Sequence, residues 1–145
     1  MLFYYLTAGT GWLLIVLLAS TILYPFLLRS GALGPVQPFL KRMQFHYWLG
    51  YAIIGMIVVH ALLSLGQGLA ESVNLPGLDL ALAALCFALI QFILGLRLRW
   101  PKLTRRRIIR RWHFWVMVTI VALLLGHIAL DSVTIHALMS KVFVR

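Results

Sequence analysis

Residues 112–130 read WHFWVMVTIVALLLGHIAL, a run that is almost entirely apolar apart from one histidine near each end. These histidines, His113 and His127, are fourteen positions apart. A second apolar run, FHYWLGYAIIGMIVVHALLSL at Phe45–Leu65, contains another pair of histidines with the same spacing. Ionisable groups are costly inside a membrane, and they commonly mark functional sites there. The two runs therefore predict a pair of membrane-spanning helices with a shared chemical role.

The composition is that of a membrane protein. Hydrophobic residues make up 63% of the 145 residues and the mean hydropathy is +0.98, whereas soluble domains contain roughly 45–50% apolar residues. Runs of about 20 apolar residues are typical of membrane-spanning helices. The chain has four such runs, at about 6–28, 43–65, 78–96 and 112–130. We therefore predict an all-α membrane protein, with residues 1–145 forming a single domain folded as an up-down four-helix transmembrane bundle.

The distribution of charge predicts an orientation in the membrane. The net charge is +10, and eight of the thirteen Lys and Arg residues lie at 97–111. The connection at 29–42 is also basic, whereas the one after the second helix contains Glu71 and no Lys or Arg. Because short cytoplasmic loops collect Lys and Arg, we expect the basic connections to be cytoplasmic and both termini periplasmic, in a bacterial inner membrane. The basic residues then serve orientation and contact with anionic lipid, and no nucleic-acid partner is expected.

A faint internal repeat relates the two halves of the chain. FHYW, eleven residues and HALL in the second helix match WHFW, eleven residues and HIAL in the fourth. Each histidine-bearing helix follows a basic connection and another apolar helix. The chain therefore reads as two copies of a helix–loop–helix unit. Parallel repeats of this kind build sites between the two halves of some membrane proteins.

The histidine spacing predicts two levels of ligands. Fourteen residues of α-helix span roughly 21 Å and return to nearly the same face. Because the second and fourth helices run in parallel, His46 and His113 share the cytoplasmic half, and His60 and His127 share the outer half. Two facing imidazoles are a ligand set for haem iron, so we predict two bis-histidine haems between these helices. Gly50, one turn after His46, leaves room for a flat macrocycle.

A purely structural role or a zinc site fits these histidines less well. A lone intramembrane histidine can be a hydrogen-bonding residue between helices, but four at two matched levels are harder to explain in this way. A zinc or proton-relay site would require a local cluster with carboxylates, and neither of the two histidine-bearing apolar runs contains an acidic residue. The sequence has one cysteine and no C-x-x-C-H motif, so the haems would be bound non-covalently.

Further polar residues have more than one interpretation. Arg110 and Arg111 lie one turn before His113, where they could pair with haem propionates or simply extend to the membrane surface. Gln91 is expected to be a hydrogen-bond donor between helices, with a quinone or propionate contact as the alternative. His136, beyond the fourth helix, is expected to be a surface histidine. No residue is assigned a catalytic role.

Two helices that each carry H-x13-H, the second preceded by RRW, resemble the ferric reductase-like transmembrane domain within the dihaem b-type cytochromes. That superfamily includes the haem subunit of the methionine sulfoxide reductase system, and the NADPH oxidases share its core. The resemblance covers roughly Met43 to Asp131. It implies two b haems, one held by His46 with His113 and the other by His60 with His127. The chain departs from the family in having four apolar helices where members often have six, and in lacking a flavin and nicotinamide domain.

The sequence therefore leads to two hypotheses about function. The first is transmembrane electron transfer through two b haems, as the haem-bearing membrane subunit of an oxidoreductase or as a quinone-linked cytochrome. Its partners would be membrane lipid and a separate redox protein, a quinone, or both. The alternative is a non-redox membrane subunit that anchors or assembles a larger complex, since the soluble segments are short and contain no evident acid–base group. Electron donor, acceptor and direction stay open.

Overall fold

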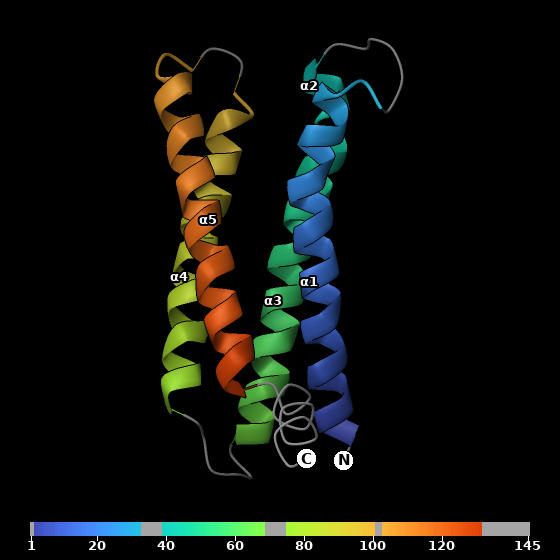
Figure 1. Cartoon of the computed structure of the whole chain (residues 1–145), viewed down its shortest axis with the longest axis vertical. Coiled ribbons are helices and arrows are strands. Elements are labelled where there is room, and N and C mark those ends of the chain that lie inside the picture. Colours follow the sequence, from blue (N-terminus) through green and yellow to red (C-terminus); the bar gives the residue numbers. More distant parts are fainter. Residues whose placement is uncertain (1, 33–38, 69–74, 101–102, 132–145) are drawn as a thin grey trace, which may run out of the picture. The chain divides into compact units, whose positions relative to one another are not determined.

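The computed structural model describes residues 2–32, 39–68, 75–100 and 103–131 (Figure 1). These residues form four long helices and one short one. The elements are α1 (Leu2–Arg29), α2 (Phe39–Arg42), α3 (Gln44–Gly68), α4 (Leu75–Leu98) and α5 (Arg106–Asp131). The four long helices are each long and apolar enough to cross a membrane. The described residues are thus helical in four long segments, and the prediction of four helices with the length and composition of membrane spans is confirmed.

The helices extend beyond the apolar runs that predicted them. The largest difference is in α5, which begins at Arg106 and not at Trp112. Arginine is a good helix former, so the helix continues through residues that a count of apolar side chains excludes. The basic segment at 97–111 is consequently helical at both ends, in α4 and in α5. The short helix α2, inside the connection at 29–42, was not predicted.

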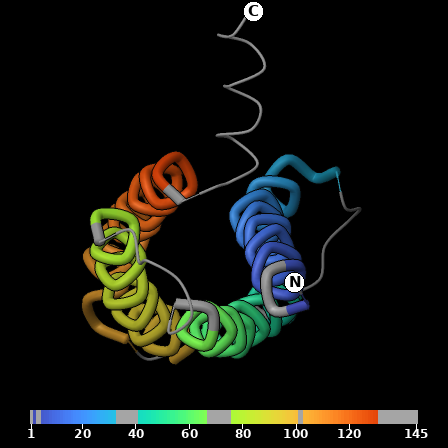
Figure 2. The backbone as a smooth tube through the Cα atoms, turned by 90° about the horizontal axis from the view of Figure 1, so that it is seen from below, coloured from blue at the N-terminus to red at the C-terminus, as the bar shows by residue number. Residues whose placement is uncertain are grey.

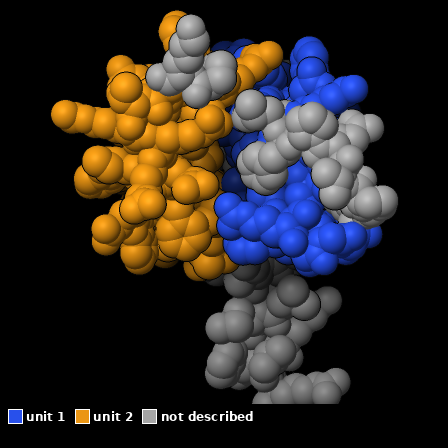
Figure 3. All heavy atoms as spheres, turned by 90° about the horizontal axis from the view of Figure 1, so that it is seen from above, with its two compact units in different colours: residues 1–71 blue, residues 72–145 orange. Residues whose placement is uncertain are grey.

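The chain divides into two compact units, residues 1–71 and residues 72–145, coloured separately in Figure 3. In the first unit α1 and α3 lie side by side, and α2 adjoins the start of α3. In the second unit α4 and α5 lie side by side, as Figures 1 and 2 both show. The division falls between the two halves of the sequence repeat. Each unit has one long helix with two of the spaced histidines and one long helix with none.

Small side chains bring α4 and α5 together. Ala84 and Ala88 on α4, and Val116 and Ile120 on α5, are buried. Lipid tails are as apolar as these side chains, so membrane helices associate through close packing, and small residues permit it. His113 and His127 lie seven residues before and after Ile120, which places both on the face of α5 that also carries this buried residue. The packed face and the histidine face of α5 therefore overlap.

Aromatic residues and a glycine stabilise the connection between α1 and α3 in the first unit. Gly31, just after α1, has a positive φ of 77°, a conformation that glycine adopts readily at the end of a helix. The hydroxyl of Tyr24 donates a hydrogen bond to the carbonyl of Arg42 at 2.8 Å. The ring of Tyr24 also packs against Phe45, with 5.1 Å between ring centroids. These contacts attach the start of α3 to the end of α1.

Candidate cofactor site

Two of the four spaced histidines donate a hydrogen bond to the backbone of the neighbouring helix. His46 Nδ1 is 3.0 Å from the carbonyl oxygen of Thr21 on α1. His127 Nδ1 is 3.1 Å from the carbonyl oxygen of Gly77 on α4. A carbonyl oxygen can only accept, so Nδ1 carries the hydrogen in both rings. In a neutral imidazole the lone pair then resides on Nε2.

His60 has the same arrangement with a hydroxyl in place of a carbonyl. Its Nδ1 is 3.0 Å from Thr10 Oγ1 on α1. That oxygen is also 2.9 Å from the carbonyl oxygens of Leu6 and Thr7. Because a hydroxyl has a single hydrogen, it can donate to one of these carbonyls and accept from His60 Nδ1. We assign the same tautomer to His60, with the lone pair on Nε2.

His113 differs from the other three. Its Nε2 lies 3.3 Å from Gln91 Nε2 on α4. An amide nitrogen can only donate, so His113 Nε2 is the acceptor in this contact. Gln91 is thus a hydrogen-bond donor between helices, as its position in the sequence predicted. Its other polar atom, Oε1, is buried and has no hydrogen-bond partner within the described part of the chain.

Glycines on α1 and α4 lie opposite two of the imidazoles. A Cβ atom added at Gly11 would be 3.3 Å from His60 Cε1, and one added at Gly95 would be 3.5 Å from His113 Cε1. Each of these imidazole rings therefore lies against a glycine of the neighbouring helix, at a position where that helix has no side chain. A Cβ added at Gly50 would meet nothing within 4 Å, and the role of Gly50 in leaving room for a macrocycle stays a prediction.

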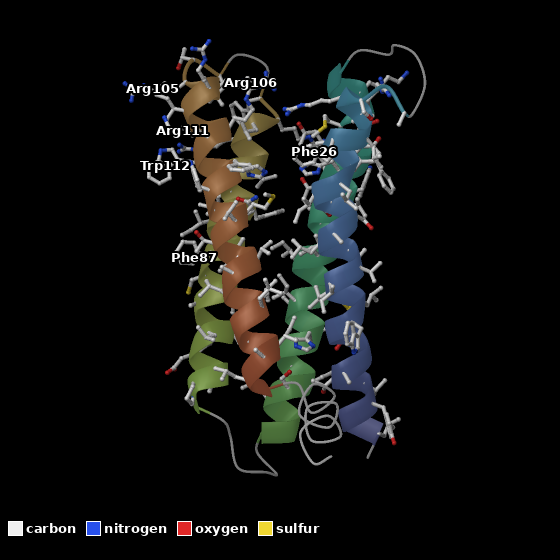
Figure 4. The ribbon with its side chains drawn as sticks, in the orientation of Figure 1. Phe26, Phe87, Arg105, Arg106, Arg111 and Trp112 are labelled. Carbon is white, nitrogen blue, oxygen red and sulfur yellow. The ribbon has the colours of Figure 1, made fainter. Side chains whose placement is uncertain are left out.

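The basic end of the second unit lies next to His113. Arg110 and Arg111 are exposed and occupy the early turns of α5. Figure 4 shows Arg105, Arg106 and Arg111 gathered at the end of the unit where α4 and α5 are connected. Arg106 Nη2 donates a hydrogen bond to the Leu98 carbonyl at 2.9 Å, which ties the start of α5 to the end of α4. The contact of Arg110 and Arg111 with propionates stays a prediction.

The two histidines of each histidine-bearing helix contact the other long helix of the same unit. His46 and His60 both hydrogen-bond to α1, and His113 and His127 both hydrogen-bond to α4. The pairing of His46 with His113, and of His60 with His127, joins the two units and stays a prediction from membrane topology. His136 lies outside the described residues. Within the described ranges no group of three or more His, Cys, Asp or Glu side chains could hold a metal ion.

Sequence reasoning did not single out Thr10, Gly11, Thr21, Gly77 and Gly95, which lie against the histidines. Thr21 and Gly77 contribute only a backbone carbonyl, which every residue has, so their identity gives no signal. A glycine within an apolar helix, such as Gly11 in α1, gives no signal either when the residue packed against it is unknown.

Comparison with known protein families, with curated proteins and with solved structures finds no match to this chain.

Proposed function

We propose that the chain is a membrane cytochrome of the b type that transfers electrons between the two surfaces of a membrane. Its four spaced histidines would hold two non-covalent haems, His46 with His113 and His60 with His127. When bound, each haem would supply a one-electron carrier with both axial positions filled. Each unit would then contribute one ligand to each haem.

The observation that carries the proposal is the hydrogen bonding of the imidazoles. Histidines that ligate a metal almost always donate their other ring N–H to a carbonyl, carboxylate or water, which fixes the ring and raises its basicity. His46 and His127 donate Nδ1–H to a backbone carbonyl in this way, and His60 is suited to do so to Thr10. With the hydrogen on Nδ1, the nitrogen of each ring that carries the lone pair for a metal is Nε2. The hydrogen bonds of these three histidines support the haem proposal.

A purely structural role explains each hydrogen bond separately, but it does not explain why both histidine helices use a spacing of fourteen residues. The rest of the chain supports a cofactor in a dry interior. The spans carry few charges, and the acidic residues Glu71, Asp79 and Asp131 are the only ones in the sequence. Arg110 and Arg111 would neutralise propionates at the level of His46 and His113. A separate redox protein, a quinone, or both would complete the path of the electrons in a bacterial inner membrane.

The test is a haem count on the full chain. The protein is purified in mild detergent from cells supplied with haem, and haem per chain is measured by the pyridine haemochrome method with reduced-minus-oxidised spectra. Two b haems per chain are expected. His136→Ala serves as the matched control and should retain both haems. A colourless protein that still assembles with partner proteins would instead establish the anchor alternative.

A further inference from the structure

Two adjacent arginines at the connected end of α4 and α5 lie in different surroundings. We propose that Arg105, together with Ile108 and Trp112, forms a surface that binds the phosphate headgroup of anionic phospholipid, whereas Arg106 holds the two helices together. The basic segment at 97–111 thus divides into arginines with separate tasks. Neither task depends on bound haem.

Arg106 is half-buried and is engaged with the end of α4. Its Nη2 donates a hydrogen bond to the carbonyl of Leu98, the last residue of α4, at 2.9 Å. The last four carbonyls of a helix have no partner within the helix, and basic side chains can satisfy them. Arg106 therefore caps α4 from the first residue of α5.

Arg105, Ile108 and Trp112 form an exposed line on another side of α5. The amide of Ile109 donates a hydrogen bond to the Arg105 carbonyl at 3.2 Å, so the helical bonding begins at Arg105. Residues three and four apart are neighbours on a helix surface, which aligns these three side chains. Arg105 is exposed, as are Ile108 (54%) and Trp112 (62%). In Figure 4 Arg105 and Trp112 extend from one side of the α4–α5 pair, and Arg106 extends from the other.

The levels of these residues along α5 match the layers of a bilayer. From Trp112 to Leu130 the helix rises about 27 Å, close to the roughly 30 Å of a hydrocarbon core. Trp112 therefore falls at the boundary of the core, where tryptophan is enriched. Arg105 lies about 10 Å farther along the axis, at the level of the headgroups. A guanidinium there can form two hydrogen bonds to one phosphate.

The first unit repeats this arrangement, which favours lipid over an acidic protein partner. Phe45 and Trp48 correspond in the sequence repeat to Trp112 and Trp115, and all four are exposed. Lys41, four residues before Phe45, is exposed as well. A bilayer surrounds a membrane protein on all sides, whereas a docked protein would need only one such surface. Both units therefore present aromatic and basic side chains suited to the same surrounding lipid.

The experiment compares the neighbouring arginines in the full chain. Wild type, Arg105→Gln and Arg106→Gln are purified in mild detergent and titrated with phosphatidylglycerol or phosphatidylcholine, and bound lipid is counted by native mass spectrometry. Arg105→Gln should weaken phosphatidylglycerol binding by about fivefold, the effect of one basic residue at an anionic surface. Binding of phosphatidylcholine, which has no net charge, should change far less.

Arg106→Gln is the matched control, because it removes the same charge one residue away. It should change phosphatidylglycerol binding far less than Arg105→Gln does, but it should lower the resistance of the helices to SDS, followed by circular dichroism. Equal loss of phosphatidylglycerol in the two variants, or no loss in Arg105→Gln, would overturn the assignment. Displacement of the lipid by inorganic phosphate would also overturn it, because the surface would then bind the free anion.

A depth measurement tests the surface without altering its charge. A nitroxide is attached to Ile108→Cys in the Cys86→Ser chain, reconstituted in vesicles that contain phosphatidylglycerol, and its accessibility to oxygen and to a water-soluble nickel complex is measured by EPR. Comparable accessibility to both, as expected between hydrocarbon and water, supports the surface. A label accessible only to the nickel complex would place this part of α5 in water and overturn the proposal.

Discussion

Replacing Gly11 by alanine tests whether the His60 ring lies against α1. The matched control is Gly9→Ala, two residues earlier in the same helix, where an added Cβ would meet nothing within 4 Å. Both changes remove a glycine from a helix interior, which stabilises a helix by about 0.8–1.0 kcal/mol. Only the change at Gly11 introduces a new contact with a histidine.

The size of the effect follows from that contact. The new Cβ would lie 3.3 Å from His60 Cε1, closer than the ordinary contact range of 3.4–4 Å. The ring must then shift by a few tenths of an ångström, which strains the 3.0 Å contact between His60 Nδ1 and Thr10 Oγ1. Such a hydrogen bond contributes about 0.5–1.5 kcal/mol. The two terms nearly cancel, so we expect Gly11→Ala to leave the free energy of unfolding almost unchanged, and Gly9→Ala to raise it by about 1 kcal/mol.

The free energies are measured by SDS titration in mixed micelles, followed by circular dichroism, and haem per chain is measured on the same samples. Gly9→Ala should keep both haems, whereas Gly11→Ala should lose occupancy at the level of His60. If the two variants gained the same stability and retained the same haem, the His60 ring would not lie against Gly11, and the orientation of His60 derived from that position would be wrong.

Three further predictions concern other parts of the chain. His46→Ala and His113→Ala should remove the same haem, identified by its redox midpoint, and loss of different haems would show that α3 and α5 are not parallel in the membrane. Tyr24→Phe should lower the free energy of unfolding by about 0.5–1.5 kcal/mol, because it deletes the hydrogen bond to the Arg42 carbonyl. SDS titration measures this, and unchanged stability would mean that the bond does not hold α1 and α3 together. Arg111→Gln should lower the midpoint of the haem near His113, because a nearby positive charge favours the reduced state. A redox titration checks this, and an unchanged midpoint would place Arg111 away from the haem.

The spans were predictable because their signal is strong and local. Four apolar runs of membrane length stand out in the sequence, and the structure has a helix over each of them. The start of α5 was harder, because a count of apolar side chains ends at Trp112 while the backbone helix begins at Arg106. The same physical property does not set both limits. The hydrocarbon core of a membrane determines where charged side chains are excluded, and helix propensity determines where the helix begins.

The candidate site was predictable only in part. Histidine is rare in apolar helices, so His60 and His113 were visible at once. Their neighbours were not, because Thr10 and Gly11 are ordinary residues in a membrane helix and acquire a role only when α3 packs beside α1. Gln91 was visible as a polar residue, but its contact with Nε2 and not Nδ1 of His113 depends on side-chain geometry that spacing alone does not define.

The hydrogen bonds that hold the imidazoles are each formed within one unit, and this has a consequence for biogenesis. The hydrogen bonds from His46 and His60 both end on α1, so every group that makes them belongs to residues 1–71. Chains emerge from the ribosome at about 5–20 residues per second, and amino-terminal parts generally fold first. The first pair of imidazoles can therefore be oriented in the bilayer while the second pair is still being translated. A nascent chain halted after the first unit would already hold two of the four predicted ligands against α1.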